Sequence, residues 1–235
     1  MYYIEINAVA ISASFRIPEA HTFQQTLPLP PLTTLVGMMG AAGGMDFESA
    51  MNYRKHRGVR FSVTGTHKGV VRDLWKYQKV KSKETISAVL LREGLTDLEM
   101  QIYLCANDEA TVAQLREWFV DPVYALTAGT SDDLLKVRSV SAVQNGVLVS
   151  AKSFANTILP GNQAGNYVSQ LDIRNIPLMT EIYAPRVQSL PVDFSFEGAS
   201  RTVMKREAFT FVDSTICLKE PIEALQARNK VVALL

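Results

Sequence analysis

The sequence predicts an α+β fold in which a ferredoxin-like (RRM-like) core carries an inserted arm and is followed by a β-rich C-terminal region. Three observations lead to this prediction. The expected elements follow the order strand, helix, strand, strand, helix, strand, which is the ferredoxin-like arrangement. The connection between the second and third strands exceeds a tight hairpin by more than twenty residues and holds most of the charge. Beyond residue 143, short runs in which apolar and polar residues alternate are separated by prolines, which predicts short strands.

The chain is expected to begin with a strand. Ile4 and Ile6 share one phase of alternation, whereas Val9 and Ile11 share the other. Because side chains alternate strictly along a regular strand, this change of phase predicts a bulge or bend near Asn7–Ala8.

A helix is expected to begin at Pro30-Pro31, after a polar loop. Proline suits the first turn of a helix, and Thr33 or Thr34 can satisfy the free amides there. Glycines such as Gly37 and Gly40 resemble a phosphate loop, but they match neither the dinucleotide spacing nor the Walker spacing, and they fall inside the helix. We therefore interpret them as sites of close helix packing, and expect a phosphate only at the start of the helix.

The remaining elements of the core follow from alternation and capping. A second strand is expected at Val59–Val63 and a third at Leu98–Leu104. A short helix follows, capped by Asn107 or Asp108, and a fourth strand lies between Leu134 and Val143. We expect a first domain, residues 1–143, with its insertion at about 67–95, and a β-rich region, residues 144–235, packed on it.

Charge is distributed unevenly, although the formal net charge is only +1. Residues 54–92 hold eleven bases and two acids, whereas residues 93–135 hold nine acids and one base. A segment like the first attracts polyanions, so we expect it to bind nucleic acid. The acidic segment repels phosphate and is expected to face solvent or a protein partner.

The inserted arm is the strongest candidate site. It alternates cations with two large aromatic residues, so it combines phosphate neutralisation with surfaces on which unpaired bases stack. The arm residues expected to contact RNA are Arg72, Trp75, Lys76, Lys79, Lys81 and Lys83. The alternative is a solvated charged hairpin whose Trp75 packs on the domain. The third-strand sequence lacks the aromatic pattern by which RNA recognition motifs stack bases on their sheet, so we expect the arm and loops to hold the RNA.

Catalysis and metal binding have little support in the sequence. The three histidines show no metal-ligand spacing, and we expect no metal or cofactor. His67 beside Lys68 is the one candidate for RNA cleavage without a metal. Two isolated cysteines fit a reducing compartment. No signal peptide or bilayer-spanning run is apparent, so the expected location is the cytoplasm, with no membrane partner.

Three stretches resemble the CRISPR-associated Cas5 family: FRIPEAHTFQQTLPLPPLTTLVGMMGAA (15–42), ISAVLLREGLTDLEMQIYLCA (86–106) and VYALTAGTSDDLLKV (123–137). The resemblance covers roughly the first 140 residues. It implies that the inserted arm is the β-hairpin thumb of the family. Where the family often has an arginine after the glycine of the third stretch, this sequence has Thr130.

The resemblance also implies a role. It indicates a subunit of a type I Cascade complex that caps the complex and grips the five-prime handle of the CRISPR RNA. The implied protein partners are the backbone subunit and the large subunit, with target DNA bound indirectly through the complex. The implied handle contacts, besides the arm, are Arg16, His21, Phe23, Gln24, Gln25, Thr33 and Thr34.

Three functions remain open from the sequence. The first is a non-catalytic subunit that binds a defined RNA end. The second is a metal-independent endoribonuclease that processes precursor CRISPR RNA; one branch of the family uses a Tyr, Lys and His set that does not align here. The third is an adaptor that binds only proteins, through residues 93–135.

Overall fold

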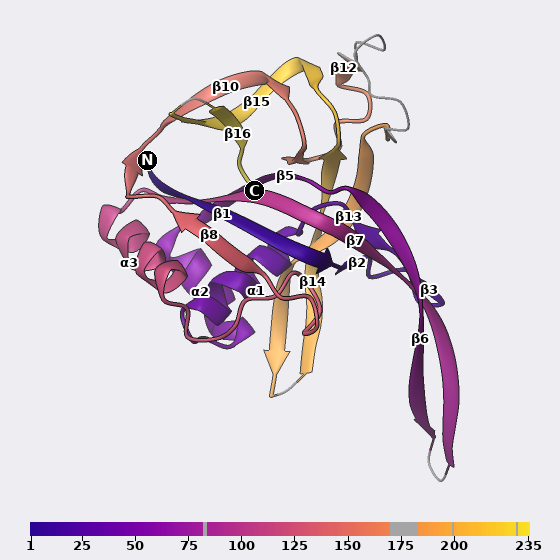
Figure 1. Ribbon diagram of the computed structural model, residues 1–235. Helices are drawn as coiled ribbons and strands as arrows, with labels where there is room; N and C mark the ends of the chain where they lie inside the picture. The colour runs from indigo at the N-terminus through magenta and orange to yellow at the C-terminus, as the bar shows by residue number, and fades with distance from the viewer. Residues whose placement is uncertain (82–83, 170–182, 199, 229) are drawn as a thin grey trace.

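The computed structural model describes residues 1–81, 84–169, 183–198, 200–228 and 230–235. In these ranges, helices cover one face of a large, almost wholly antiparallel sheet, and a small second sheet lies against the other face (Figure 1). The expected α+β class is confirmed. The helices are α1 (Leu32–Ala42), α2 (Phe47–Arg57) and α3 (Glu109–Val120). None of them, in the part of the chain described, is long and apolar enough to cross a membrane.

Four strands form one half of the large sheet, in the order β5, β7, β1 and β8, each antiparallel to its neighbour. Their bounds are Arg60–Thr66 for β5, Glu84–Ala106 for β7, Tyr2–Ala13 for β1 and Lys136–Val140 for β8. Apolar side chains of these strands pack with α1 and α3 in one large core. β1 and β7 pair over their full shared length, from Tyr2–Ala106 to Ala13–Leu95.

An irregularity in the pairing of β1 with β8 falls at Asn7 and Ala8, where the sequence predicts one. The extra residue is Arg138, on β8. β1 therefore keeps its phase, so that Ala8 and Ala10 are buried and Ile11 is 86% exposed. The predicted change of phase within β1 is wrong because the bulge belongs to the partner strand.

The N-terminal cap of α3 is one of the residues predicted from the sequence, whereas that of α1 is not. Asp108 caps α3, accepting a hydrogen bond from the Thr111 backbone amide at 3.0 Å. The cap residue of α1 is Pro31, and no side chain caps the first turn. The prediction that Thr33 or Thr34 would satisfy the free amides is wrong, because both residues already lie within that turn.

α2 is a helix that the sequence motifs do not predict. It packs closely against α1, since a Cβ on Gly40 would lie 2.8 Å from the Ala50 Cβ. This confirms close packing as the role of that glycine. Asp46 caps α2 by accepting from the Ser49 amide at 2.7 Å, and Gly58 ends it in the left-handed conformation, with φ of 61°.

The first basic side chains of the segment 54–92 belong to α2 and to β5, the strand after it. Arg54, Lys55 and Arg57 lie in the last turn of α2, where positive charge is stabilised by the helix dipole. The Lys55 Nζ lies 2.6 Å from Asp193 Oδ1, and Arg60 lies 2.6 Å from a carboxylate of β15. Lys55 and Arg60 are therefore held by carboxylates of the C-terminal region in the body of the protein.

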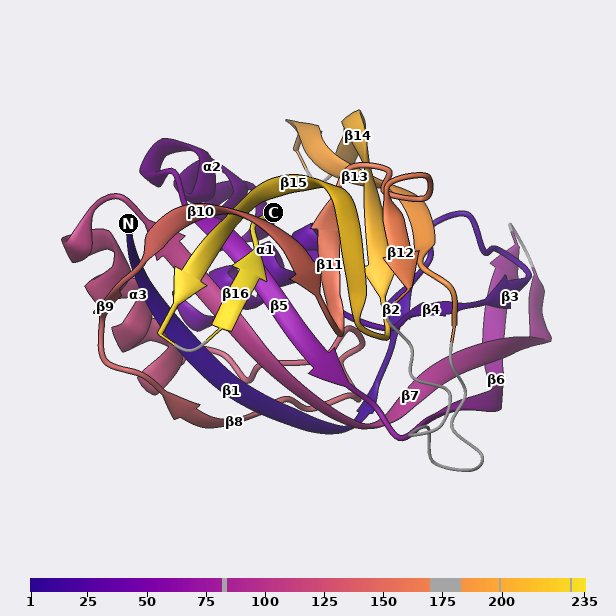
Figure 2. The same cartoon turned by 90° about the horizontal axis from the view of Figure 1, so that it is seen from above.

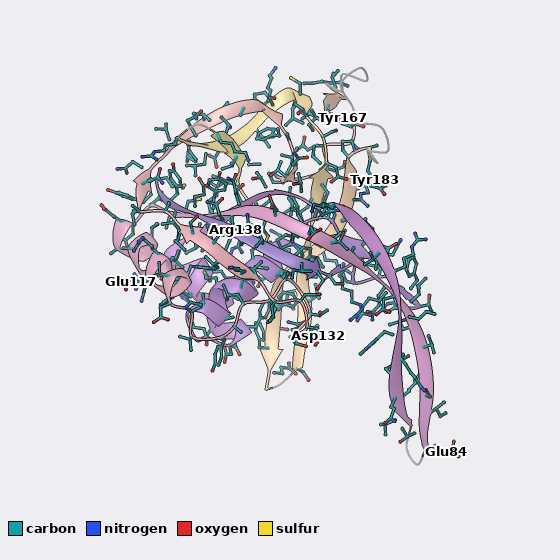
Figure 3. The ribbon with its side chains drawn as sticks, in the orientation of Figure 1. Glu84, Glu117, Asp132, Arg138, Tyr167 and Tyr183 are labelled. Atoms are coloured by element: carbon teal, nitrogen blue, oxygen red, sulfur yellow. The ribbon has the colours of Figure 1, made fainter. Side chains whose placement is uncertain are left out.

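β6 (Gly69–Lys81) pairs with the first half of β7 from Gly69–Thr96 to Lys81–Glu84. The two strands form a long ribbon, here called the hairpin arm, that leaves the body on one side (Figure 1). Glu84 marks its far end (Figure 3). β7 is one strand of 23 residues that runs from the arm into the centre of the sheet, so the core fixes the base of the arm.

The chain after residue 143 is β-rich, as predicted. Three strands continue the large sheet beyond β5, in the order β11, β14, β13, and the small sheet contains β10, β15, β12 and β16. The strand bounds are β9 (Gln144–Asn145), β10 (Val147–Phe154), β11 (Thr157–Pro160), β12 (Tyr167–Ser169), β13 (Arg186–Glu197), β14 (Ser200–Val212), β15 (Ile216–Ala227) and β16 (Lys230–Ala233).

The small sheet closes much of the face of the large sheet that RNA recognition motifs use for base stacking. Seen from above, the small sheet lies over part of the large sheet (Figure 2). Tyr3, Tyr103 and Cys105 on that face are buried against Leu225 and Val232. Burial raises the pKa of the Cys105 thiol to about 12, so this cysteine behaves as a small buried hydrophobe. The small sheet therefore covers the part of this face formed by Tyr3, Tyr103 and Cys105.

Candidate nucleic-acid interface

The hairpin arm has two faces of different chemistry, because successive side chains of a strand point to opposite sides. One face, here called the aromatic face, carries Asp73, Trp75, Tyr77, Lys79 and, from β7, Arg92. The other, the aliphatic face, carries Arg72, Lys76 and several exposed apolar side chains, namely Leu74, Val80 and Val89. The single contact surface predicted from the sequence is therefore divided in two.

The aromatic face is a ready stacking surface. The Trp75 and Tyr77 rings are stacked, with centroids 5.6 Å apart and planes 20° apart. The guanidinium carbon of Arg92 lies 5.6 Å from the Trp75 ring centre. Trp75 remains 44% exposed, so part of the indole is accessible to an unpaired base.

Two lysines of the arm are available to phosphates. Lys76 and Lys79 are exposed, and no carboxylate of the described residues lies within ion-pair distance of either. Lys81 ends β6, but its side chain is not among those described. The predicted contact Lys83 lies outside the described residues.

The loop named in the resemblance connects the body to the root of the arm. Arg16 lies on β2 (Phe15–Arg16), which pairs with β4 (Thr26–Leu27), and His21 is exposed between them. Phe23 and Gln24 form β3 (Phe23–Gln24), which lies parallel to β7. The guanidinium carbon of Arg72 is 5.6 Å from the Phe23 ring, so this contact ties the loop to the arm.

A cavity of about 520 Å³, here called the root pocket, lies where the arm meets the body. Gln25, His67 and Arg72 line it from the first half of the chain, and Tyr183 and Arg186 line it from the second half. Figure 3 labels Tyr183 beside β13. The guanidinium carbon of Arg186 lies 4.9 Å from the Tyr183 ring centre.

Carboxylates accompany the cations of the root pocket. Glu93 is almost fully buried, and its carboxylate lies 3.4 Å from both the Arg72 Nε and the Thr26 amide. Arg186 lies 3.5 Å from Asp213, whose pKa is raised by burial against the opposing effect of the cation. Burial also lowers the pKa of His67, so its imidazole is neutral at pH 7.

A second cavity, about 740 Å³ in volume and here called the α1 cleft, opens at the N-terminal end of α1. Arg16, Thr33 and Thr34 line it, so the structure brings Arg16 close to two threonines that lie farther along the sequence. Arg201 and Arg206 of β14 line its other wall. No carboxylate lines the cleft within the described ranges, and the uncapped amides of α1 favour an anion there.

Three arginines of the C-terminal region that no sequence motif singles out also line these cavities: Arg186, Arg201 and Arg206. A local signal was present, since residues 200–206 hold three cations and no acid. What the sequence does not reveal is that β13 and β14 lie beside α1. That placement results from pairing between strands far apart in the chain, such as β14 with β11 and β11 with β5.

Comparisons with known proteins agree with this architecture. The family model described as "CRISPR-associated protein (Cas_Cas5)" matches residues 8–194, which is more than half of the chain. The match reaches beyond the stretches that carry the resemblance and into β13. A search of curated proteins found no match.

Two solved structures share the fold. One, described as a "CRISPR RNA-guided surveillance complex", aligns over 93% of this chain and 91% of that chain, with a TM-score of 0.54 and 15% identity. The other, a CRISPR protein from Archaeoglobus fulgidus, aligns over 99% of this chain and 98% of that chain, with a TM-score of 0.52 and 11% identity. At these identities the likeness concerns the fold alone. With the family model spanning most of the sequence, the chain belongs to the CRISPR-associated Cas5 family.

Proposed function

We propose that this chain is a non-catalytic RNA-binding subunit of a type I CRISPR Cascade complex, which caps the complex and grips the five-prime handle of the CRISPR RNA. The observation that carries the proposal is the aromatic face of the hairpin arm. There the stacked Trp75 and Tyr77 lie beside Lys79, which has no carboxylate partner in the described part of the chain. The proposal that the bound RNA is CRISPR RNA is supported by family membership and by the similar fold of the chain described as a "CRISPR RNA-guided surveillance complex".

The proposed architecture is a ferredoxin-like core made of β1, β5, β7 and β8 with α1 and α3, and the hairpin arm is its thumb. The strand order β5, β7, β1, β8 supports this proposal, because it is the order of a ferredoxin-like sheet. In domain terms, residues 1–143 form the RNA-binding domain, with the thumb at about 67–95, and residues 144–235 form the β-rich region packed on it.

The proposed RNA contacts lie on three neighbouring parts of the molecule. They are the hairpin arm from Arg72 to Lys83, the loop from His21 to Gln25, and the α1 cleft. Phosphates bind the cations and the free amides of α1, while unpaired bases stack on Trp75.

The protein partners are proposed to bind at the free edge of β8, where the large sheet ends. An apolar groove of about 780 Å³ follows this edge, with Ile11 86% exposed and Leu134 65% exposed. Figure 3 shows Glu117 and Asp132 on this side of the molecule. This edge suits a neighbouring Cascade subunit that brings apolar anchors and basic residues, and that pairs with β8 as an added strand.

Titration of purified protein with handle-bearing RNA tests the proposed function. We expect binding that weakens as salt rises, with a slope of log affinity against log salt of about −0.7 for each phosphate contacted. A scrambled handle of equal length is the control and should bind more weakly. Absent or salt-insensitive binding would contradict the proposal, and copurification without RNA would favour the protein-binding adaptor.

A second candidate function is metal-independent cleavage of precursor CRISPR RNA. The observation that favours it is the position of His67 in the root pocket, with Arg72 and Arg186 lining the same cavity. A neutral imidazole can accept the proton of a 2′-hydroxyl, and guanidinium groups can stabilise the charge that develops on the phosphate.

Incubation of the protein with precursor repeat RNA in EDTA distinguishes the two functions. For a non-catalytic subunit we expect uncut RNA over the pH range in which His67 is neutral, with the same result for His67→Ala. Cleavage that His67→Ala abolishes, while RNA affinity is retained, would instead establish the endoribonuclease. Cleavage that persists in the variant would point to other residues or to a contaminating nuclease.

A further inference from the structure

We propose that β13 and β14 form the second wall of an RNA-binding track, which runs from the root pocket to the α1 cleft and ends at a nucleotide site on Arg201. This inference rests on the proposed function and adds to it a path and a terminal binding site. The ligand is a single-stranded RNA segment. Its last unpaired base stacks against Arg201, and the adjoining phosphate binds between Arg16 and the start of α1.

The path follows from three adjoining hollows along β13. Arg186, at the start of β13, lines the root pocket. Gln188 and Ser189 line a middle hollow of about 450 Å³, whose opposite side is the loop containing Glu19 and Gln25. Gln25 also lines the root pocket, so the two hollows share a wall.

The third hollow is the α1 cleft, which β13 reaches with Leu190, Pro191 and Phe194. One strand therefore borders all three hollows in sequence. From above, β2 and β4 are seen between the C-terminal strands and the hairpin arm (Figure 2).

Positive charge accompanies the whole track. Arg72 and Arg186 lie at its start, Arg206 is in the middle, and Arg16 and Arg201 are at the end. The carboxylates that face these cations are Glu93 on Arg72, Asp213 on Arg186 and Glu19 on Arg206. In the described part of the chain, no carboxylate pairs with Arg16 or Arg201.

β13 is the last strand of the large sheet, so its outer edge has backbone groups that no described strand pairs with. One of them, the Ser189 carbonyl, accepts a hydrogen bond from the Arg206 Nη1 at 3.1 Å. Such an edge offers donors and acceptors to the phosphates and 2′-hydroxyls of RNA, and it is sequence-tolerant.

The terminal site is a cation held by aromatic rings. The guanidinium carbon of Arg201 lies 5.1 Å from the Phe47 ring centre and 5.6 Å from that of Phe194. The two rings contact each other edge to face, with centroids 5.6 Å apart. Arginine planes stack on unpaired bases, and here the guanidinium is already oriented by the rings behind it.

One ion pair restricts the track between the middle hollow and the α1 cleft. The Arg206 Nη1 lies 2.6 Å from the Glu19 Oε1, and this contact joins β14 to the loop. A phosphate that enters the cleft replaces the Glu19 carboxylate on Arg206. Removal of the negative charge of Glu19 should therefore favour RNA.

The test uses the full chain with a fluorescent handle-bearing RNA and with versions shortened by one nucleotide at a time from one end. For Arg201→Ala we expect affinity about 5- to 30-fold lower for the longest RNA, corresponding to one lost stack and one lost charge. Removal of the terminal nucleotide should make the wild type and this variant bind equally well. Lys205→Ala is the matched control, because Lys205 lies on the same strand, lines none of the three hollows and pairs with Glu207 at 2.7 Å.

Glu19→Gln is expected to raise the affinity for RNA, whereas Arg201→Ala lowers it. A misfolded variant would not bind more tightly, so loss of folding cannot produce this result. We expect Glu19→Gln to bind handle-bearing RNA about 2- to 5-fold more tightly at low salt, as a phosphate no longer competes with a carboxylate. The inference is overturned if Arg201→Ala and Lys205→Ala bind every RNA length alike and Glu19→Gln does not bind more tightly. If the wild type in that case still binds the handle, the proposed function stands, whereas a wild type that binds no handle overturns both.

Discussion

Replacement of Trp75 and Lys79 by alanine is expected to weaken the binding of handle-bearing RNA about 10- to 100-fold. The two residues share the aromatic face of the hairpin arm, where Trp75 is stacked on Tyr77 and supported by Arg92. Loss of the indole removes a base stack worth about 1–3 kcal/mol, and loss of the lysine removes one phosphate contact. The salt dependence of binding should also become weaker: the slope of log affinity against log salt should become less negative by about 0.7, which corresponds to one lost phosphate contact. A fluorescence titration at several salt concentrations measures both quantities.

The matched control is Leu74→Ala with Lys76→Ala on the aliphatic face. Leu74 is 70% exposed and Lys76 is exposed, so this pair removes the same charge and a comparable apolar side chain from the same strand. We expect a smaller loss, of about 3-fold, because this pair removes a phosphate contact of Lys76 but no aromatic ring on which a base stacks. Equal losses in the two double variants would show that the RNA does not distinguish the faces, and a larger loss in the control would place it on the aliphatic face.

Gly129→Ala is expected to destabilise the protein by about 2–4 kcal/mol. Gly129 has φ of 110°, a conformation that disfavours any residue with a Cβ. A Cβ there would lie 1.9 Å from the Ser14 carbonyl oxygen. The loop must therefore move, which breaks the hydrogen bond from the Ser14 amide to the Ala128 carbonyl at 2.9 Å. Urea unfolding monitored by circular dichroism measures the loss.

Gly58→Ala separates the backbone strain from the clash. Gly58 also has a positive φ, 61°, but a Cβ there would meet no heavy atom within 4 Å. We expect a cost of about 1 kcal/mol, the ordinary penalty for an L-residue in the left-handed region. Gly129 and Arg16 both line the α1 cleft, so Gly129→Ala should also weaken RNA binding, whereas Gly58→Ala should not. Equal destabilisation by the two substitutions would contradict the role given to the contact with Ser14.

The elements that the sequence predicts best are those whose signal is local. Alternation identified β5 and the core half of β7, and a capping residue followed by an amphipathic pattern identified α3. The concentration of free cations in the arm is a property of the chain itself, so it survives in the structure as the exposed Lys76 and Lys79. By contrast, α2 has little apolar periodicity, since only Ala50 and Met51 are buried, and periodicity therefore did not predict it.

The candidate site likewise has some features that follow from local sequence and others that depend on the tertiary structure. The sequence by itself determined that a basic arm interleaved with aromatic residues is inserted into an α+β core, because composition and alternation depend on neighbouring residues. Only the tertiary structure decided which cations remain free. It assigned Lys55 and Arg60 to ion pairs, split the arm into two faces, and covered part of the sheet face with the small sheet. It also placed Arg201 and Arg206 opposite Arg16, because burial and strand pairing bring together residues that no local pattern connects.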